Sequence, residues 1–295
     1  MFKRFFLFFG VNILIVVTIS MVVNLLGVGH YMTAQGIDYQ ALMVLCLIWG
    51  MGGSFISLMM SKWLAKMTMG VEIITLTGPY SEVVQIIHRH AKMAGLRVMP
   101  EVGIFNSPEV NAFATGPSKN NSLVAISTGL LSKMGRDEIE GVVGHEVAHI
   151  ANGDMVTMTL LQGIMNAFVM FFARVVAFMI DQAMRKDDDD GRGLGTFAHM
   201  GIVFVLELLF GLVAGILLSW FSRQREYRAD AGGAKLAGKE KMIGALEGLI
   251  RSYSTLPQSE EGSFKSMKIS SKKSFLALFS THPSLEDRIR TLQAR

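Results

Sequence analysis

Long apolar runs separated by polar stretches dominate the pattern of hydrophobic and polar residues along the chain. There are four of them, at about residues 5–28, 39–60, 155–180 and 197–221. A helix needs about 20 apolar residues to cross the hydrocarbon core of a bilayer, and each run is long enough. Their order predicts two helical hairpins, one at the N-terminus and one in the second half of the chain. The pattern therefore indicates a membrane protein.

The basic residues around the first two runs predict the orientation of the first hairpin. Lys3 and Arg4 precede the first run, which we expect to be an uncleaved anchor because it is too long for a leader and no small-residue cleavage site follows it. Lys62 and Lys66 follow the second run, whereas the loop 29–38 contains no lysine or arginine. Since lysine and arginine accumulate on the cytoplasmic side, both ends of this hairpin are predicted to face the cytoplasm of a bacterial inner (plasma) membrane.

The charges of the second hairpin do not define its topology. Its connecting loop combines the acidic stretch 187–190 with Arg185, Lys186 and Arg192. If both runs span the bilayer, or if neither does, the chain leaves the hairpin on the side on which it entered. The polar segments before and after the hairpin are therefore predicted to lie together in the cytoplasm.

Arg174 and Glu207 are ionisable residues within the two runs of this second hairpin. Ionisable residues in membranes commonly serve a function, but here a structural role is favoured. Arg174 lies near the end of its run and can extend its head group to the interface, and Glu207 can pair with it or face a wet cleft. Small residues spaced four apart would let the two helices approach closely, namely the pairs Gly163/Ala167 and Gly211/Gly215.

The composition becomes polar between the hairpins, at residues 71–137, and turn residues divide this part into short elements. Residues 81–94 are predicted to form a helix that ends at Gly95. His88 and His90 on this helix face different directions, so they are interpreted as surface or packing residues. Three short strands are predicted in a meander, at 98–105, 109–115 and 122–128.

The overall composition excludes several classes of protein. Half of the residues are hydrophobic (51%), and the formal net charge is only +4. The basic residues cluster beside apolar runs and do not form one basic face with interleaved aromatics, so nucleic acid is not expected as a partner. The single cysteine, Cys46, lies within an apolar run, which excludes a disulfide framework and a thiolate metal site.

The strongest chemical signal is the sequence G-H-E-V-A-H-I-A-N at residues 144–152. On a helix, His145 and His149 project from one face and can hold one zinc ion, while Glu146 reaches a water on the metal. A buried histidine pair without a metal is the alternative. The flanks favour a helix, because acidic residues in the first turn precede a set of core-facing apolar residues: Asp137, Glu138 and Glu140, then Val142, Val143, Val147 and Ile150.

A catalytic zinc ion needs a third protein ligand, which must be a histidine or a carboxylate in this chain. The third histidine of the metzincin pattern is absent at its expected spacing. Glu226 and Asp230 follow the fourth apolar run and share one face of a helix. One of them can bind zinc while the other accepts the outer N–H of a ligating histidine. The alternative is a solvated helix on which Arg225 or Arg228 pairs with these acids.

The order of motifs along the whole chain resembles the HtpX family of membrane metalloproteases, which is related to the CAAX prenyl endopeptidases. The resemblance rests on the two apolar pairs and on four motifs, Asn111-Ala112-Phe113-Ala114, His145-Glu-Val-Ala-His149, Glu226-Tyr-Arg-Ala-Asp230 and His282-Pro283. It implies that Glu226 is the third zinc ligand and that Asp230 supports the site. It also implies that His282 stabilises the oxyanion formed during peptide hydrolysis. Alternatively, His282 only leads into the last helix, since residues 284–287 (S-L-E-D) form a capping box.

These residues predict a zinc metalloendopeptidase with one zinc ion per chain, held by His145, His149 and Glu226. Glu146 would act as the general base on the metal's water and then as the acid for the leaving amine. The resemblance implies unfolded, misfolded or damaged membrane proteins as substrates, as part of quality control under stress. The alternatives are a CAAX-type prenyl-peptide endopeptidase, a non-catalytic zinc-binding scaffold in the membrane and a small-ion transporter.

Two other segments bear on partners. Residues Asn111, Ala112, Phe113 and Ala114 are predicted to form either a substrate-binding edge strand or an ordinary strand of the sheet. The segment 233–239 matches part of a nucleotide-binding loop, but Glu240 replaces the required Ser or Thr and no strand precedes it. No nucleotide partner is therefore expected, and proteolysis is predicted to be independent of ATP. Residues 257–274, rich in Ser, Lys and Glu, are predicted to form a loop.

The expected fold is an α+β membrane protein that is mainly helical, with a zincin-like catalytic domain, a small β-meander and four apolar helices in two hairpins. We expect an N-terminal transmembrane hairpin at 1–66 and the second apolar hairpin at 154–221. The catalytic domain is predicted in two parts, with the helix, sheet and HExxH helix at 67–153 and the ExxxD and C-terminal helices at 222–295.

Overall fold

The protein is described by a computed structural model that places residues 19, 21, 32–33, 36–187, 195–254 and 280–295. The predicted first apolar run, apart from Ile19 and Met21, and the predicted loop 257–274 lie outside these residues. The chain forms two compact units, one of residues 1–57 and 159–218 and the other of residues 58–158 and 219–295. Three long helices pass from one unit to the other, and each unit is described below by itself.

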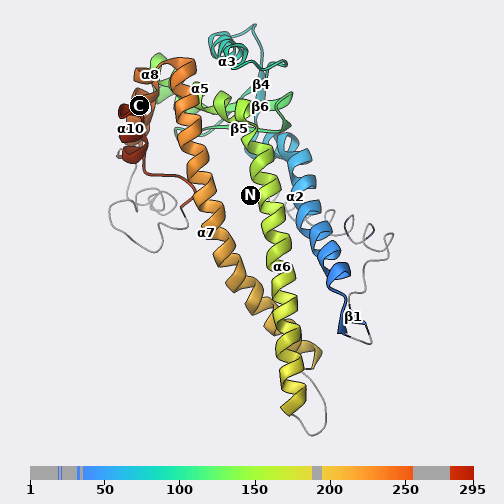
Figure 1. The fold of residues 1–295 in the computed structure, drawn as a ribbon. Helices are drawn as coiled ribbons and strands as arrows, with labels where there is room; N and C mark the ends of the chain where they lie inside the picture. The colour runs from blue at the N-terminus through green and yellow to red at the C-terminus, as the bar shows by residue number, and fades with distance from the viewer. Residues whose placement is uncertain (1–18, 20, 22–31, 34–35, 188–194, 255–279) are drawn as a thin grey trace. The chain divides into compact units, whose positions relative to one another are not determined.

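The first unit contains the apolar parts of these long helices, which are labelled in Figure 1. They are α2 (Tyr39–Met69), α6 (Asp154–Asp187) and α7 (Thr196–Ala237). Within the described residues, these three helices are long and apolar enough to cross a membrane. They contain three of the four predicted runs. Each helix continues beyond its run into polar sequence, which the hydrophobic pattern did not predict.

A short two-stranded ribbon precedes α2, with β1 (Met32–Thr33) antiparallel to β2 (Gly36–Ile37). Asp38 follows the ribbon and begins α2. Its side chain accepts hydrogen bonds from the backbone N–H groups of Gln40 at 3.0 Å and Ala41 at 2.9 Å. These bonds satisfy donors at the helix start that have no partner within the helix.

The small residues of α6 face α2, and not α7 as the sequence suggested. A Cβ atom added to Gly50 of α2 would lie 2.6 Å from the backbone nitrogen of Ala167 and 2.7 Å from the carbonyl oxygen of Gly163. A Cβ atom added to Gly211 of α7 would meet none of the described residues within 4 Å. The spacing of small residues identified a close helix contact correctly, but one sequence does not specify which helix is the partner.

The expected pairing of Arg174 with Glu207 is present within the first unit. The Arg174 guanidinium donates to a Glu207 carboxylate oxygen at 2.8 Å, and its Nη1 also donates to the carbonyl oxygen of Met170 at 2.9 Å. This pair joins α6 to α7. Each charge therefore has an opposite charge beside it in an apolar environment, where an unpaired charge is unfavourable.

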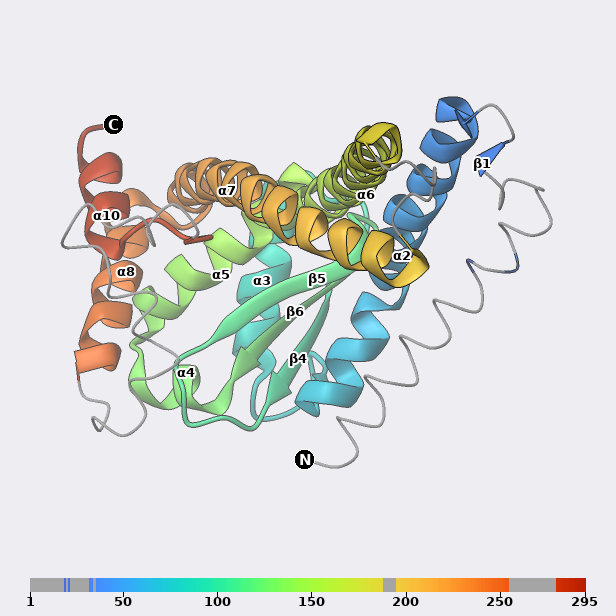
Figure 2. The same ribbon diagram turned by 90° about the horizontal axis from the view of Figure 1, so that it is seen from below.

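The second unit is built on a four-stranded sheet in the order β3-β4-β6-β5. Its strands are β3 (Glu72–Ile74), β4 (Glu101–Phe105), β5 (Ala112–Ser118) and β6 (Asn121–Ser127). Figure 2 shows β5, β6 and β4 side by side. The predicted meander was wrong, because β6 pairs in parallel with β4 and separates it from β5.

The burial of the strands explains this order. The central strand β6 carries the continuous apolar run Leu123-Val124-Ala125-Ile126, which is fully buried on both faces. A strand that is apolar on both sides is stable in the middle of a sheet, with neighbours on each edge. β5 is only partly buried along most of its length and occupies the edge. A meander would have left β6 at the edge.

Helices cover one face of this sheet and form the main core with it. Among the described residues, the other helices of the unit are α3 (Ser81–Met93), α4 (Thr128–Lys133), α5 (Arg136–Asn152), α8 (Lys239–Ser254) and α10 (Leu285–Gln293). α3 matches its prediction, and Gly95 follows it with a positive φ of 75°. As expected, His88 and His90 have separate surroundings: His88 contacts the carbonyl oxygen of Pro100 at 3.2 Å, whereas His90 is buried.

Candidate metal centre

The helix α5 carries the HExxH sequence, and both of its ends are fixed by local interactions. At its start, the Glu138 carboxylate accepts a hydrogen bond from the backbone N–H of Gly135 at 2.9 Å. At its end, Gly153 adopts the left-handed conformation with a φ of 74°. The side chain of Lys119, from the β5–β6 turn, donates to the carbonyl oxygen of Ala151 and so satisfies a terminal acceptor of α5.

The two histidines of α5 converge, as the i, i+4 spacing predicts. The Nε2 atoms of His145 and His149 lie 3.0 Å apart, and their rings meet edge to face with centroids 4.6 Å apart. Both side chains are largely buried. The Nε2 atoms therefore face a common point beside α5.

Glu226 supplies a carboxylate at this point from the polar half of α7. Its side chain is only 2% exposed, with Oε2 at 3.5 Å from His145 Nε2 and Oε1 at 3.4 Å from His149 Nε2. Arg225 also approaches Glu226, at 3.4 Å, so the pairing considered for a solvated helix is present in part. Glu226 is nevertheless buried between the two histidines, and not on a solvated surface.

Glycines allow α7 and α8 to approach α5 closely enough for this contact. A Cβ atom on Gly233 would lie 3.0 Å from the backbone nitrogen of His145, and one on Gly232 would lie 2.6 Å from the Cβ of Ala148. A Cβ atom on Gly141 would lie 2.8 Å from the Cβ of Ala245. Gly233 belongs to the segment that resembles a nucleotide-binding loop, but there it lies within helix α7 and packs against the metal-site helix.

Buried charged residues lie next to Nδ1 of His145, the ring nitrogen that faces away from His149. This Nδ1 lies 2.9 Å from an Asp230 carboxylate oxygen. Arg288 of α10 donates two hydrogen bonds to Asp230, at 2.8 and 2.6 Å. Burial alone would lower the pKa of Arg288, but the ion pair with Asp230 raises it, so this guanidinium stays charged. The sequence placed Asp230 beside the site but did not identify Arg288.

A second carboxylate, Asp154, contacts the other histidine. Its Oδ2 lies 2.6 Å from His149 Nδ1. Burial alone would lower the pKa of His149, but hydrogen bonds with Asp154 and Glu226 raise it from 6.5 to about 9. A metal that binds His149 must therefore displace a proton at neutral pH. Asp154 was not identified from the sequence, although it follows the motif closely, because it fell at the boundary of the predicted hairpin 154–221, just before the apolar run.

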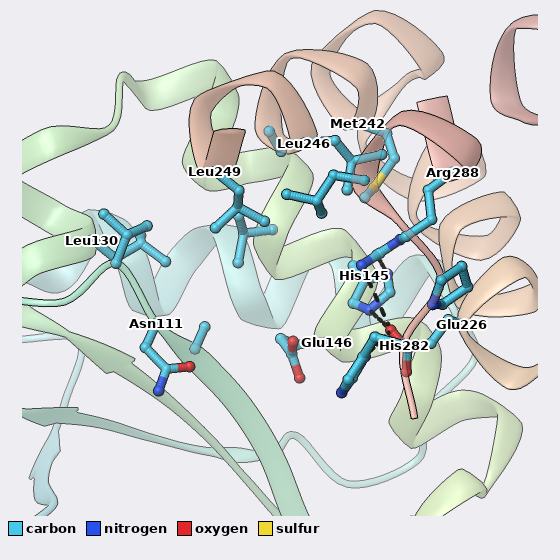
Figure 3. A pocket seen from close by; sticks show the side chains of 16 residues that line it. Asn111, Leu130, His145, Glu146, Glu226, Met242, Leu246, Leu249, His282 and Arg288 are labelled. Carbon is cyan, nitrogen blue, oxygen red and sulfur yellow. Dashed lines mark hydrogen bonds and ion pairs between the residues drawn. The ribbon is translucent and has the colours of Figure 1, made fainter. Parts of the chain in front are cut away.

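Glu146 and His282 lie at the edge of a pocket beside this cluster. Figure 3 shows Glu146 between Asn111 and His282, with Glu226 below His145. Glu146 is partly exposed and has no hydrogen-bond or ion-pair partner in the described part of the chain. His282 contacts Glu226, with Nδ1 at 3.1 Å from Oε2. The capping interaction is also present, because the Ser284 side chain accepts a hydrogen bond from Asp287 N–H at 3.0 Å.

The segment Asn111 to Ala114 lies at the sheet edge next to the pocket. Asn111 and Ala112 line the pocket, and Ala112 begins the edge strand β5. The backbone of Asn111 bonds to Ser127, accepting from its N–H at 2.9 Å and donating to its hydroxyl at 3.0 Å. Because hydrogen bonding alternates along an antiparallel strand, the main-chain groups of Ala112 and Ala114 point to the open edge.

The donor set fits a divalent metal. One ligand atom from each of His145, His149 and Glu226 lies within 4.8 Å of the other two. These are two imidazoles and one carboxylate, as in catalytic zinc sites, whereas structural zinc sites generally have four protein ligands. Each histidine also has a carboxylate next to Nδ1, the ring nitrogen that does not face the cluster, as is usual for metal-ligating histidines. Together with Glu146, which has no hydrogen-bond or ion-pair partner among the described residues, they define a centre of the metallopeptidase class.

Comparison with known proteins agrees with this class. Residues 79–295 match peptidase family M48. Protease HtpX of Shewanella pealeana is 52% identical over 294 residues, which cover 99% of each chain. The Protease HtpX homolog of Bacillus licheniformis is 50% identical over 303 residues, again with 99% of each chain covered. The chain therefore belongs to peptidase family M48 and is a metalloprotease.

A solved structure shares the fold. S. mikatae Ste24p matches with a TM-score of 0.66 at 17% sequence identity, over 99% of this chain. The match covers 64% of the Ste24p chain, so this protein spans somewhat less than two thirds of that length. At this identity the likeness concerns the fold alone.

Proposed function

We propose that the protein is a zinc-dependent endopeptidase that cleaves misfolded or damaged membrane proteins at the cytoplasmic surface of the bacterial inner membrane. The observation that supports it most directly is the buried cluster of His145, His149 and Glu226 with Glu146 beside it. Zinc is the metal that we propose, because two imidazoles, one carboxylate and no thiolate are the ligands of catalytic zinc in peptidases.

Bound zinc would polarise the scissile carbonyl and lower the pKa of a water to about 7. Glu146 takes a proton from the attacking water, because its carboxylate has no competing partner among the described residues and lies at the pocket. It then delivers this proton to the nitrogen of the leaving amine. One carboxylate thus serves as base and then as acid within a turnover.

His282 is proposed to stabilise the oxyanion that forms at the scissile carbonyl. Its side chain is 43% exposed and lines the same pocket as Glu146. The contact with Glu226 holds the ring through Nδ1, and in the imidazolium form, in which both ring nitrogens are donors, Nε2 can donate to the substrate. The N-cap at Ser284 fixes the backbone just after His282, so the capping function and the proposed catalytic function are compatible.

The edge strand β5 is proposed to bind the substrate in an extended conformation. The outward main-chain groups of Ala112 and Ala114 provide donors and acceptors at the edge, and Ala112 lines the pocket. Pairing of this kind recognises backbone and only weakly selects side chains. Such recognition suits unfolded segments of many sequences, with no nucleotide involved in their cleavage.

A casein digestion assay on detergent-purified full-length protein tests the proposal. We expect wild type to digest casein, and both a chelator and the Glu146→Ala substitution to abolish digestion. Glu247→Ala is the matched control, because Glu247 is an exposed glutamate on α8. Zinc analysis should find one ion per chain in wild type. Equal digestion by wild type and Glu146→Ala would refute the mechanism, and cleavage restricted to prenylated peptides would favour the CAAX-type alternative.

A further inference from the structure

The two histidines of the metal centre are supported by different carboxylates. His145 Nδ1 faces Asp230 at 2.9 Å, and His149 Nδ1 faces Asp154 at 2.6 Å. In both rings, Nε2 points to the ligand cluster. A ring whose Nδ1–H donates to a carboxylate presents the lone pair of Nε2 to a metal.

Asp154 is placed by the junction between two helices. Gly153 ends α5 in the left-handed conformation, and Asp154 is the first residue of α6. Asp154 is only 3% exposed, and His149 is the only hydrogen-bond or ion-pair partner of its side chain in the described ranges. A carboxylate in the first turn of a helix is stabilised by the positive end of the helix dipole. The same fold that ends the HExxH helix therefore brings a buried negative charge to His149.

Asp230 differs, because its charge is shared with a permanent cation. Arg288 donates two hydrogen bonds to Asp230, and its Nη2 lies 3.3 Å from His145 Nδ1. Asp230 thus divides its acceptor capacity between Arg288 and His145. Among the described residues, Asp154 has no ion pair with a lysine or arginine, and it directs its acceptor capacity to His149.

We propose that Asp154 is a positioning residue for metal binding, which fixes the tautomer and orientation of His149 so that Nε2 faces Glu226 and His145. This inference depends on the proposed function only in requiring that the cluster bind a divalent metal. Without the Asp154 carboxylate, the ring of His149 can rotate or carry its proton on Nε2, and either change removes one ligand atom. Loss of such a supporting carboxylate typically weakens metal binding by about 10- to 100-fold.

Zinc affinity and cobalt spectroscopy of full-length protein in detergent test the proposal. Asp154→Asn keeps the size of the side chain and its suitability for a helix start. We expect about 10- to 100-fold weaker zinc binding in competition with a chromogenic chelator. The absorption bands of the Co²⁺-substituted protein should also change, because they report the geometry of the ligands. The melting temperature of the metal-free variant should stay close to that of metal-free wild type.

Asp38→Asn is the matched control, since Asp38 also caps the start of a long apolar helix but contacts no histidine among the described residues. It should leave zinc affinity and the cobalt spectrum unchanged. Asp154→Ala serves as the second variant if Asp154→Asn does not fold, with the same expected loss of affinity. Zinc affinity and a cobalt spectrum equal to wild type in a folded Asp154 variant would overturn the inference. Failure of wild type to bind either metal would instead refute the proposed function.

Discussion

The two halves of α7 belong to one continuous helix but differ in the kinds of side chain that they expose and bury. Up to about residue 218, large apolar side chains such as Phe204, Leu208 and Leu212 are more than half exposed. From residue 219 onward, the helix buries polar side chains, including Glu226 and Asp230. In a bilayer the first half would be in contact with lipid, whereas the second half buries its charges against partners of opposite charge.

This difference shows where sequence is constrained by specific contacts. The apolar half needs hydrophobicity and length, so many side chains satisfy it. The polar half needs particular atoms at particular positions, because Glu226 lies between two histidines and Gly233 lies against the backbone of His145. Matched substitutions in the two halves should therefore have unequal effects, and the following predictions are ordered by their expected size.

Glutamate-to-glutamine substitutions in the two halves of α7 should differ most, in their effect on zinc binding. Glu226→Gln removes the charge of the proposed third ligand, and we expect zinc affinity to fall by more than the roughly 100-fold typical for loss of a supporting residue. Proteolysis should be lost with it. Glu207→Gln in the apolar half should retain wild-type zinc affinity. Metal analysis measures the zinc occupancy of both variants, and chelator competition measures their zinc affinity. Full zinc occupancy in Glu226→Gln would assign the third ligand to another residue.

Glycine-to-alanine substitutions should show the same contrast in stability. A Cβ atom at position 233 would lie 2.8 Å from the sulfur of Met242 and 3.0 Å from the nitrogen of His145, so Gly233→Ala should destabilise the protein by about 1–3 kcal/mol. At Gly211 the space is open among the described residues, and Gly211→Ala should cause no loss. Thermal unfolding in detergent compares the two. Equal melting temperatures would show that α7 is not held closely against α5.

The sequence predicted the features that depend on local spacing. The i, i+4 pattern of His145 and His149 and the capping residue Ser284 are properties of single helices, and both were confirmed. Placement of Glu226 as a ligand depended on the family resemblance, because the residues alone also allowed a solvated helix. The parallel pairing of β4 with β6 could not be derived from local pattern, since strand order is determined by contacts distant in sequence.

The remaining site residues were missed for a common reason. Asp154, Arg288 and Gly233 have ordinary roles in their local sequence, as a helix start, a basic residue and part of a decoy motif. Their importance depends on which residues of distant segments they contact: Arg288 is 58 positions from Asp230 and 143 from His145. A search for a buried partner to each ligand histidine's outer nitrogen would have suggested Asp154, which follows His149 by five residues.

The ion pair in the apolar unit should have a moderate effect. Arg174→Met leaves Glu207 without its partner, and Glu207→Gln leaves Arg174 without its partner. Polar contacts between membrane helices are worth about 0.6 kcal/mol on average and about 1.7 kcal/mol at most, so the coupling energy should lie in this range. A double-mutant cycle of thermal or denaturant stability in detergent measures it. A coupling energy of zero would show that the pair does not join α6 to α7.

The smallest effect is expected from the charge cluster around Glu140 in the polar unit. The buried Glu140 carboxylate contacts Lys241 at 2.8 Å, Arg89 at 3.1 Å and Arg136 at 3.8 Å. Lys241 also contacts Asp137 at 2.8 Å. Burial by itself raises the pKa of Glu140, but the hydrogen bonds from Lys241 and Arg89 lower it below its usual 4.5. Burial, and then Arg89 and Lys241, lower the pKa of the neighbouring His90 below its usual 6.5. His90 is therefore neutral at pH 7.

Because the pKa of Glu140 is lower in the folded state, its contribution to stability is present above pH 4.5 and is lost as the pH falls through the folded-state value. The difference in melting temperature between wild type and Glu140→Gln should therefore be greatest above pH 4.5 and shrink at more acidic pH. Glu247→Gln, on the exposed face of α8, should show no such pH dependence. A difference between wild type and Glu140→Gln that stays constant with pH would mean that packing, and not the charge of Glu140, accounts for its effect on the polar unit.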